Sequence, residues 1–89
     1  RIVFTLGVVY NTPTEKLEQI PTIIKNIIES QPLATFDRAH FAKFNSFSLD
    51  FEIVFFIESS DYMEYMNTQQ EINLKIFRAF DAEKIAFAY

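Results

Sequence analysis

One histidine and no cysteine are present in the 89 residues, so few side chains are available as nucleophiles or metal ligands. His40 could act as a general base or bind a metal, but a protein zinc site would need further His or Cys ligands. The sequence contains none. We therefore predict that His40 lies on one face of a sheet, opposite an acidic residue of a neighbouring strand such as Asp50 or Glu52.

Three carboxylates could carry out acid–base chemistry, because Asp50, Glu52 and Glu58 fall on one face of a predicted strand. Catalysis would also need a pocket and a nucleophile, and the sequence indicates neither. Cross-strand pairing with Arg38 and Lys43 accounts for the same carboxylates without a reaction. We predict that the chain is not an enzyme and has no catalytic, cofactor-binding or metal-binding residues.

Two other features bear on ligand binding. Gly7 is the only glycine, which excludes a glycine-rich loop that cradles phosphate. Tyr62, Tyr65 and Met66 stand at helical spacing and could form a stacking site for a ligand. The same spacing is typical of side chains in the core and at its rim, and we favour that interpretation.

Gln69 and Asn73 fall in the middle of a predicted buried stripe. Buried amides need hydrogen-bond partners. They could bond to backbone at a strand end or loop, or they could make a polar contact that fixes the register of the helix. Either way we predict that both are largely buried.

Hydrophobic periodicity predicts six elements that would position these residues. In chain order they are a strand at 2–10, a helix ended by Pro32, strands at 36–44 and 49–57, a helix from near Ser60 or Asp61, and a short strand at 84–89. This order predicts one α+β domain over residues 1–89. The expected fold is ferredoxin-like (β-α-β-β-α-β), with two helices on one face of a mainly antiparallel four-stranded sheet of order 4-1-3-2.

Both helices have start signals. Thr12 is the predicted N-cap of the first, followed by proline, and Glu15 completes a capping box. Asp61 and Glu64 form the equivalent box for the second. Pro21 predicts a kink or a restarted turn inside the first helix. The predicted core-facing residues are Leu17, Ile20, Ile24, Ile27 and Ile28 in the first helix, and Tyr62, Tyr65, Met66, Ile72, Ile76, Phe77 and Phe80 in the second.

The predicted sheet has two faces of different chemistry. Ala39 and Phe41 should point to the core, together with the wholly apolar face of the third strand: Leu49, Phe51, Ile53, Phe55 and Ile57. The opposite face has an apolar centre and a charged rim, which is the usual anatomy of a contact surface. Scattered exposed hydrophobic residues are the alternative. The candidate interface residues are Val3, Thr5, Val9, Val54 and Phe56.

The composition fits one folded domain, with 49% hydrophobic and 17% aromatic residues in a chain of 89. The net charge of −4 argues against nucleic acid or an anionic membrane surface as a partner. An RNA-recognition module is also excluded, because the acidic residues on the third strand would repel phosphate. No apolar run approaches the ~20 residues that span a bilayer.

Five segments are similar to those of one known family: "FTLGVVYNTPTEKLEQIPTIIKNII", "FDRAHFAKF", "SLDFEIVFFI", "DYMEYMNTQQEINLKIFRAF" and "IAFAY". The most specific parts lie at 7–12, 61–66 and 69–73. Together they resemble the C-terminal cytoplasmic domain of small-conductance mechanosensitive (MscS-type) channels over nearly the whole chain. Residues 45–48, "NSFS", stand where family members often carry a Gly-Asp-Ser-Ser-like turn.

The resemblance implies a piece of a bacterial inner-membrane channel, usually a heptamer, that opens under tension and releases small solutes on hypoosmotic shock. The segment would form part of the wall of a cytoplasmic chamber. It would follow a pore helix and a small β-domain, and precede a strand of a barrel shared between subunits. Only the segments before it would touch the membrane. The isolated chain would be a monomer or a weak dimer through the open sheet face, without channel activity.

A free-standing ferredoxin-like domain that binds a small ligand or regulates another protein is the alternative, because this fold hosts many functions. The start at Arg1 rather than Met, and the lack of a catalytic set, favour the channel interpretation.

Overall fold

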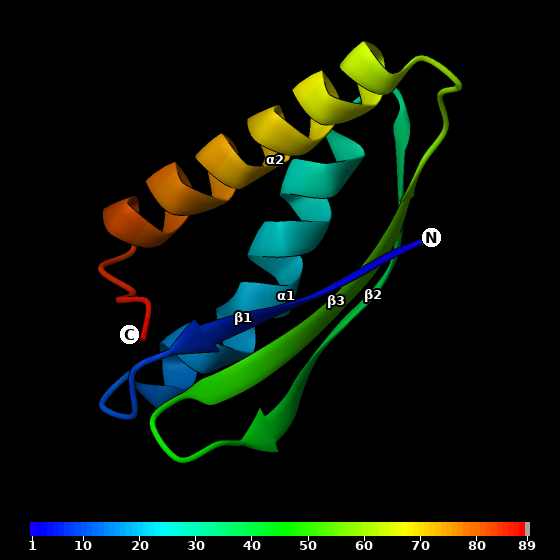
Figure 1. The fold of residues 1–89 in the computed structure, drawn as a ribbon. Coiled ribbons are helices and arrows are strands. Elements are labelled where there is room, and N and C mark those ends of the chain that lie inside the picture. Colours follow the sequence, from blue (N-terminus) through cyan, green and yellow to red (C-terminus); the bar gives the residue numbers. More distant parts are fainter. Residues whose placement is uncertain (89) are drawn as a thin grey trace.

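The computed structural model describes residues 1–88 and has two layers, with the strands in one and both helices in the other (Figure 1). The elements are β1 (Ile2–Val8), α1 (Thr14–Glu29), β2 (Ala34–Phe44), β3 (Leu49–Ile57) and α2 (Tyr62–Ala82). The strands pair antiparallel in the order β1-β3-β2. The predicted α+β class is confirmed, as is the position of the third strand between the first two.

The predicted fourth strand is wrong for the residues that the structure describes. Within 84–88 there is a single antiparallel bridge, between Val8 and Phe87. The Val9 N–H donates to the Ala86 carbonyl (3.1 Å), and the Ala88 N–H donates to the Gly7 carbonyl (2.9 Å). Helix α2 extends to Ala82, and Lys84 and Ile85, the first residues of the predicted strand, belong to the turn that ends this helix. Tyr89, the last residue of the predicted strand, lies outside the described residues.

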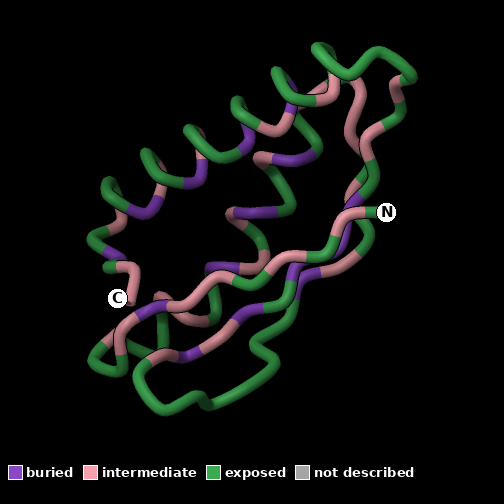
Figure 2. The backbone as a smooth tube through the Cα atoms, in the orientation of Figure 1, coloured by how far each residue is buried: buried purple, intermediate pink, exposed green. Residues whose placement is uncertain are grey.

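The core lies between β3 and the two helices, as the alternation along β3 predicts. Phe51, Ile53 and Phe55 are fully buried, Leu49 is nearly so, and Ile57 is half-buried. Spacing by four residues places one face of α1 against them, formed by Ile20, Ile24 and Ile28. Figure 2 shows buried positions following β3 and the inner sides of both helices.

The start of α1 differs from the prediction. The helix begins at Thr14, and its N-cap Pro13 makes no side-chain capping bond. Thr12 Oγ1 instead donates to the Val9 carbonyl (2.7 Å), so it is engaged in the preceding turn and the predicted capping box is wrong. The helix continues through Pro21 to Glu29, so no turn restarts there.

The start of α2 follows the prediction only in its cap. Asp61 is the N-cap, and its Oδ1 accepts from the Met63 N–H (2.9 Å). Glu64 does not reach back to the Asp61 N–H, because that donor bonds to Ser59 Oγ (3.0 Å). The Ser59 hydroxyl in turn donates to Glu64 Oε1 (2.8 Å), so a serine completes the cap in place of the predicted box.

The predicted buried face of α2 is partly wrong. The buried residues are Thr68, Ile72, Ile76 and Phe80, at a regular spacing of four. Three of the remaining predicted members are exposed, namely Tyr62, Met66 and Phe77. The fourth, Tyr65, is half-buried. Thr68 occupies the position that continues the isoleucine row, so the core face is rotated away from the two tyrosines.

Gln69 and Asn73 are consequently not the buried pair that we predicted. Asn73 is exposed and Gln69 is half-buried. Gln69 Nε2 donates to Asn73 Oδ1 (3.0 Å), so the two amides bond to each other, one helical turn apart, rather than to backbone of a strand or loop.

The hairpin between β2 and β3 brings the last predicted core residues into place. Ala39 is buried, and the partly exposed ring of Phe41 stacks on Phe51 with centroids 5.1 Å apart. The hairpin closes with the Asn45 N–H donating to the Ser48 carbonyl (2.8 Å), as its length predicts. A Cβ added to Gly7 would come within 3.0 Å of Ser48 Cβ, so the single glycine lets the hairpin end lie close to β1.

A Schellman motif ends α2. The Ile85 N–H donates to the Phe80 carbonyl (2.8 Å), and the Lys84 N–H donates to the Asp81 carbonyl (3.1 Å). Lys84 has a positive φ of 59°, in the left-handed region where glycine is usual. Ile85 is buried after this turn and joins the core cluster with Phe80.

Lys84→Gly is expected to raise the free energy of unfolding by up to about 1 kcal/mol, because a side chain in the left-handed region costs roughly 1–2 kcal/mol and glycine's greater unfolded-state entropy offsets part of that gain. Urea denaturation of the two proteins would measure the difference. Lys84→Ala is the matched control, since it removes the charge and keeps the Cβ, and it should not stabilise. Equal stabilisation by both variants would contradict a backbone origin.

Candidate interface on the open sheet face

The sheet face that the helices leave open is the candidate site. Register places Val3 opposite Val54 and Thr5 opposite Glu52 across β1 and β3. On the other side of β3, Arg38 lies opposite Val54, and the next β2 residue of this face, His40, lies opposite Glu52. The strand alternation therefore brings an apolar centre and charged neighbours together, as predicted.

The predicted interface residues differ in how far their side chains are exposed to solvent. Val3 is 48% exposed and Phe56 is 36% exposed, and the two are diagonal neighbours on adjacent strands. Val54 is 0% exposed and lies outside the main core cluster. Its position on the central strand gives it neighbours on both sides. Val54 thus supports the surface, while Val3 and Phe56 form it.

The two remaining predicted residues lie toward the other end of β1. Thr5 is exposed beside Glu52. Val9 is half-buried just beyond β1, where its N–H bonds to the Ala86 carbonyl. The open face therefore groups Val3, Thr5, Val54 and Phe56, whereas Val9 belongs to the contact between β1 and the C-terminal segment.

The charged neighbours are arranged only in part as the sequence predicts. His40 faces Glu52 across the strands, as expected. Arg38, however, forms its ion pair with the adjacent Asp37 (Nη1–Oδ2 2.8 Å) rather than with a β3 carboxylate. Its register partner is the apolar Val54, next to a bulge between Phe36 and Arg38.

Asp50 lies opposite Lys43, yet its hydrogen bonds come from the hairpin. Ser48 Oγ donates to Asp50 Oδ1 (2.6 Å), and Asn45 Nδ2 donates to Asp50 Oδ2 (3.2 Å). The carboxylate therefore holds the turn in shape. Among residues 1–88 no three His, Cys, Asp or Glu side chains gather as metal ligands would.

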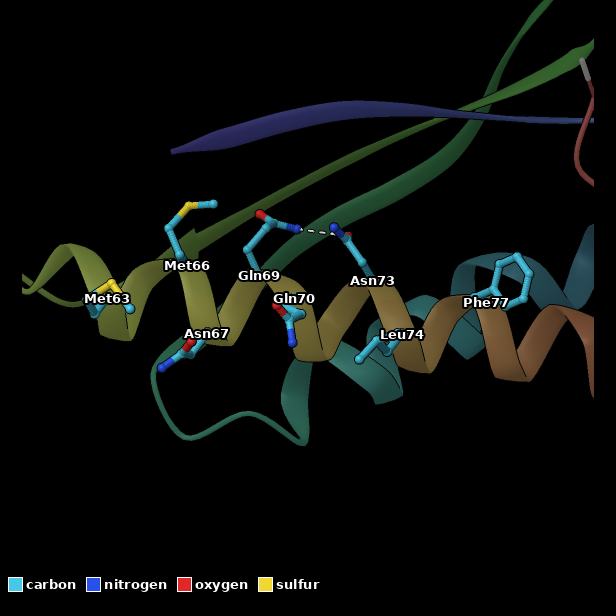
Figure 3. Close-up of a pocket in the computed structure, with 8 residues that line it drawn as sticks. All are labelled: Met63, Met66, Asn67, Gln69, Gln70, Asn73, Leu74 and Phe77. Carbon is cyan, nitrogen blue, oxygen red and sulfur yellow. Dashed lines mark hydrogen bonds between the residues drawn. The ribbon is translucent and has the colours of Figure 1, made fainter.

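A second exposed apolar surface runs along α2 and was not predicted. Figure 3 shows the side chains that line a pocket along this helix, projecting away from the helix axis. The residues that line it are Met63, Met66, Asn67, Gln69, Gln70, Asn73, Leu74 and Phe77. The sequence signal for this surface is a second apolar stripe on the helix, and the predicted buried face includes two of its residues, Met66 and Phe77.

A family model of the C-terminal region of the mechanosensitive ion channel MscS matches residues 2–87. The chain belongs to the MscS family. The family membership that the sequence motifs predict is thus confirmed, and the family consists of mechanosensitive ion channels rather than enzymes.

Three relatives of this MscS-family domain cover nearly all of it. The small-conductance mechanosensitive channel MscMJ of Methanocaldococcus jannaschii is 38% identical over 91 residues, which cover 100% of this chain and 26% of the relative. The large-conductance channel MscMJLR of the same organism is 38% identical over 94 residues (96% and 25%). An uncharacterized MscS family protein of Aquifex aeolicus is 32% identical over 92 residues (100% and 25%).

The MscS-family chain spans about a quarter of the length of these relatives. Neither helix in residues 1–88 combines the length and the hydrophobicity that crossing a membrane requires. Two of the relatives come from an archaeon, so the expected bacterial origin stays a prediction.

Proposed function

We propose that this chain is a cytoplasmic domain of a mechanosensitive channel, where it forms part of the wall of a chamber beneath the pore. The channel would open under membrane tension and release small solutes on hypoosmotic shock. The match of residues 2–87 to the C-terminal region of MscS is the observation that carries this proposal. The domain's role would be structural, in assembly, and would involve no reaction or cofactor.

The partners are other copies of the same subunit, and we expect seven in the full-length channel of the inner membrane. The open sheet face is the proposed contact surface, covered in the assembly by a neighbouring subunit or by another part of the channel. Two observations support this assignment. Val3 and Phe56 expose apolar surface beside each other, and Glu52 and His40 border them.

Phe56→Glu in the full-length channel tests the contact surface. A carboxylate at the centre of an apolar contact would lose its hydration on assembly, so we expect less assembled channel on gel filtration of detergent-solubilised membranes. The isolated domain should stay folded by circular dichroism, because Phe56 already reaches solvent.

Phe47→Glu is the matched control, since Phe47 is another exposed phenylalanine but lies in the β2–β3 hairpin. It should leave both folding and assembly unchanged. A Phe56→Glu channel that assembles normally, together with an isolated domain that unfolds, would show that Phe56 belongs to the core. The contact surface would then lie elsewhere.

A further inference from the structure

The outward face of α2 carries large apolar side chains without a single charge over four turns. Met63 and Phe77 are 63% and 64% exposed. Seven exposed residues make up this face, which we call the α2 strip: Met63, Met66, Asn67, Gln70, Asn73, Leu74 and Phe77. The opposite side of the same helix faces the core through Ile72, Ile76 and Phe80. A helix with apolar residues on both sides is usually covered on both sides.

The α2 strip is symmetric about Gln70. Reversing the helix direction around this residue exchanges Met63 with Phe77 and Met66 with Leu74. It also exchanges Asn67 with Asn73 and leaves Gln70 in place. A second α2 laid antiparallel would therefore set Met63 level with Phe77 of the second copy, and Met66 level with Leu74. Apolar side chains then meet along the middle of the contact, and the asparagines lie at its edges. Few unrelated partners would present this order, whereas a second copy presents it automatically.

The charges beside the α2 strip fit the same arrangement. Glu64, Glu71 and Arg78 are spaced by seven residues and so form one row along a single flank of the helix. In an antiparallel two-fold pair, this flank of one α2 lies beside the same flank of the other α2. Glu64 then lies about two residues, or ~3 Å, along the axis from Arg78 of the second copy. Two such attractive pairs form, whereas Glu71 lies close to its own counterpart and repels it.

We propose that the α2 strip is a self-association surface through which two copies of this chain pack their α2 helices antiparallel, with Gln70 beside the two-fold axis. This proposal does not depend on the function of the open sheet face. A two-fold contact cannot join successive members of a seven-membered ring. In a heptameric channel it would therefore join two separate assemblies, and in the isolated chain it would give a weak dimer.

Sedimentation equilibrium of the 89-residue chain over a range of concentrations would measure the dimer. Phe77→Lys should raise the dissociation constant by at least about tenfold, as expected for the loss of an aromatic anchor in a contact. Phe56→Glu, on the open sheet face, should leave it unchanged. Glu71→Gln should lower the dissociation constant, because it removes the repulsion at the axis.

Charge reversal tests the antiparallel orientation. Glu64→Lys alone and Arg78→Glu alone should each weaken the dimer, and the double variant should restore it. Circular dichroism would show that each variant remains folded. A wild-type chain that stays monomeric at every concentration, or a double variant weaker than both single ones, would overturn the proposal.

Cysteine cross-linking gives a second measure, and the chain offers a clean background because it contains no cysteine. Gln70→Cys should form a disulfide with its own copy. Met63→Cys should cross-link to Phe77→Cys in a mixture of the two variants and not to itself. Efficient self-linking of Met63→Cys would indicate parallel helices. Linking of Phe77→Cys to Phe56→Cys would place the α2 strip against the open sheet face. Either result would overturn the proposed pairing.

Discussion

Replacing Phe51 by alanine is expected to lower the free energy of unfolding by about 3–5 kcal/mol, the usual cost of truncating a fully buried phenylalanine. Phe51 lies on the core face of β3 and has no exposed surface. Its register partners are Leu6 on β1 and Phe41 on β2, and the Phe41 ring stacks on it. The truncation therefore leaves a cavity and also deprives Phe41 of its packing partner.

Urea denaturation with the midpoint and slope fitted together would measure this loss. Phe56→Ala is the matched control, because it removes the same side chain from the opposite face of the same strand. We expect it to cost under about 1.5 kcal/mol, since Phe56 is partly exposed. A smaller loss for Phe51→Ala than for Phe56→Ala would mean that the two faces of β3 are assigned the wrong way round.

Phe80→Ala is the second substitution expected to cost about 3–5 kcal/mol. Phe80 is fully buried, and its ring stacks on Phe87 with centroids 5.0 Å apart. Phe87 forms the single bridge to Val8. Removing the Phe80 ring should therefore loosen the C-terminal segment as well as the core. Hydrogen exchange of the Val9 and Ala88 amides should accelerate more than that of amides in the middle of β3.

Phe77→Ala provides the comparison for this helix. Its ring also stacks on Phe87, at 6.1 Å, but it is largely exposed. We expect the free energy of unfolding to fall by under about 1 kcal/mol. If Phe77→Ala and Phe80→Ala lower the free energy of unfolding equally, the sequence-based prediction that Phe77 and Phe80 are buried together would be right.

Strict alternation made β3 and its neighbours predictable, because one face of a central strand must be apolar to cover the core. The same reasoning identified α1, where isoleucines at a spacing of four leave one choice of face. On α2 it failed. Apolar residues occupy both sides of this helix, so periodicity alone could not separate the core stripe from the α2 strip, and buried Thr68 gave no apolar signal.

Local hydrogen bonds account for most of the other differences. Thr12 could cap α1 or close the turn at Val9, and the sequence does not indicate which acceptor it meets. Asp50 could pair with Lys43 or bond to the hairpin, and Ser48 and Asn45 are simply nearer in the chain. At the open sheet face, alternation predicts the shared side of Val3, Thr5, Val54 and Phe56, whereas Val9 lies beyond β1. It could not show that Val54 has no exposed surface, because that depends on neighbours from two other strands.

The single bridge at Phe87 gives the C-terminal segment a mechanical property that the rest of the sheet lacks. Within residues 1–88, this segment is held to β1 and α2 by the backbone bonds at Val9 and Ala88 and by the Phe87 ring, which stacks on Phe77 and Phe80. The ladders between β3 and its two neighbours run the length of the strands. A pull on residue 88 would peel the segment away at a force well below that needed to shear the sheet. The segment would then detach and extend under a small load, while the sheet and the core stay folded.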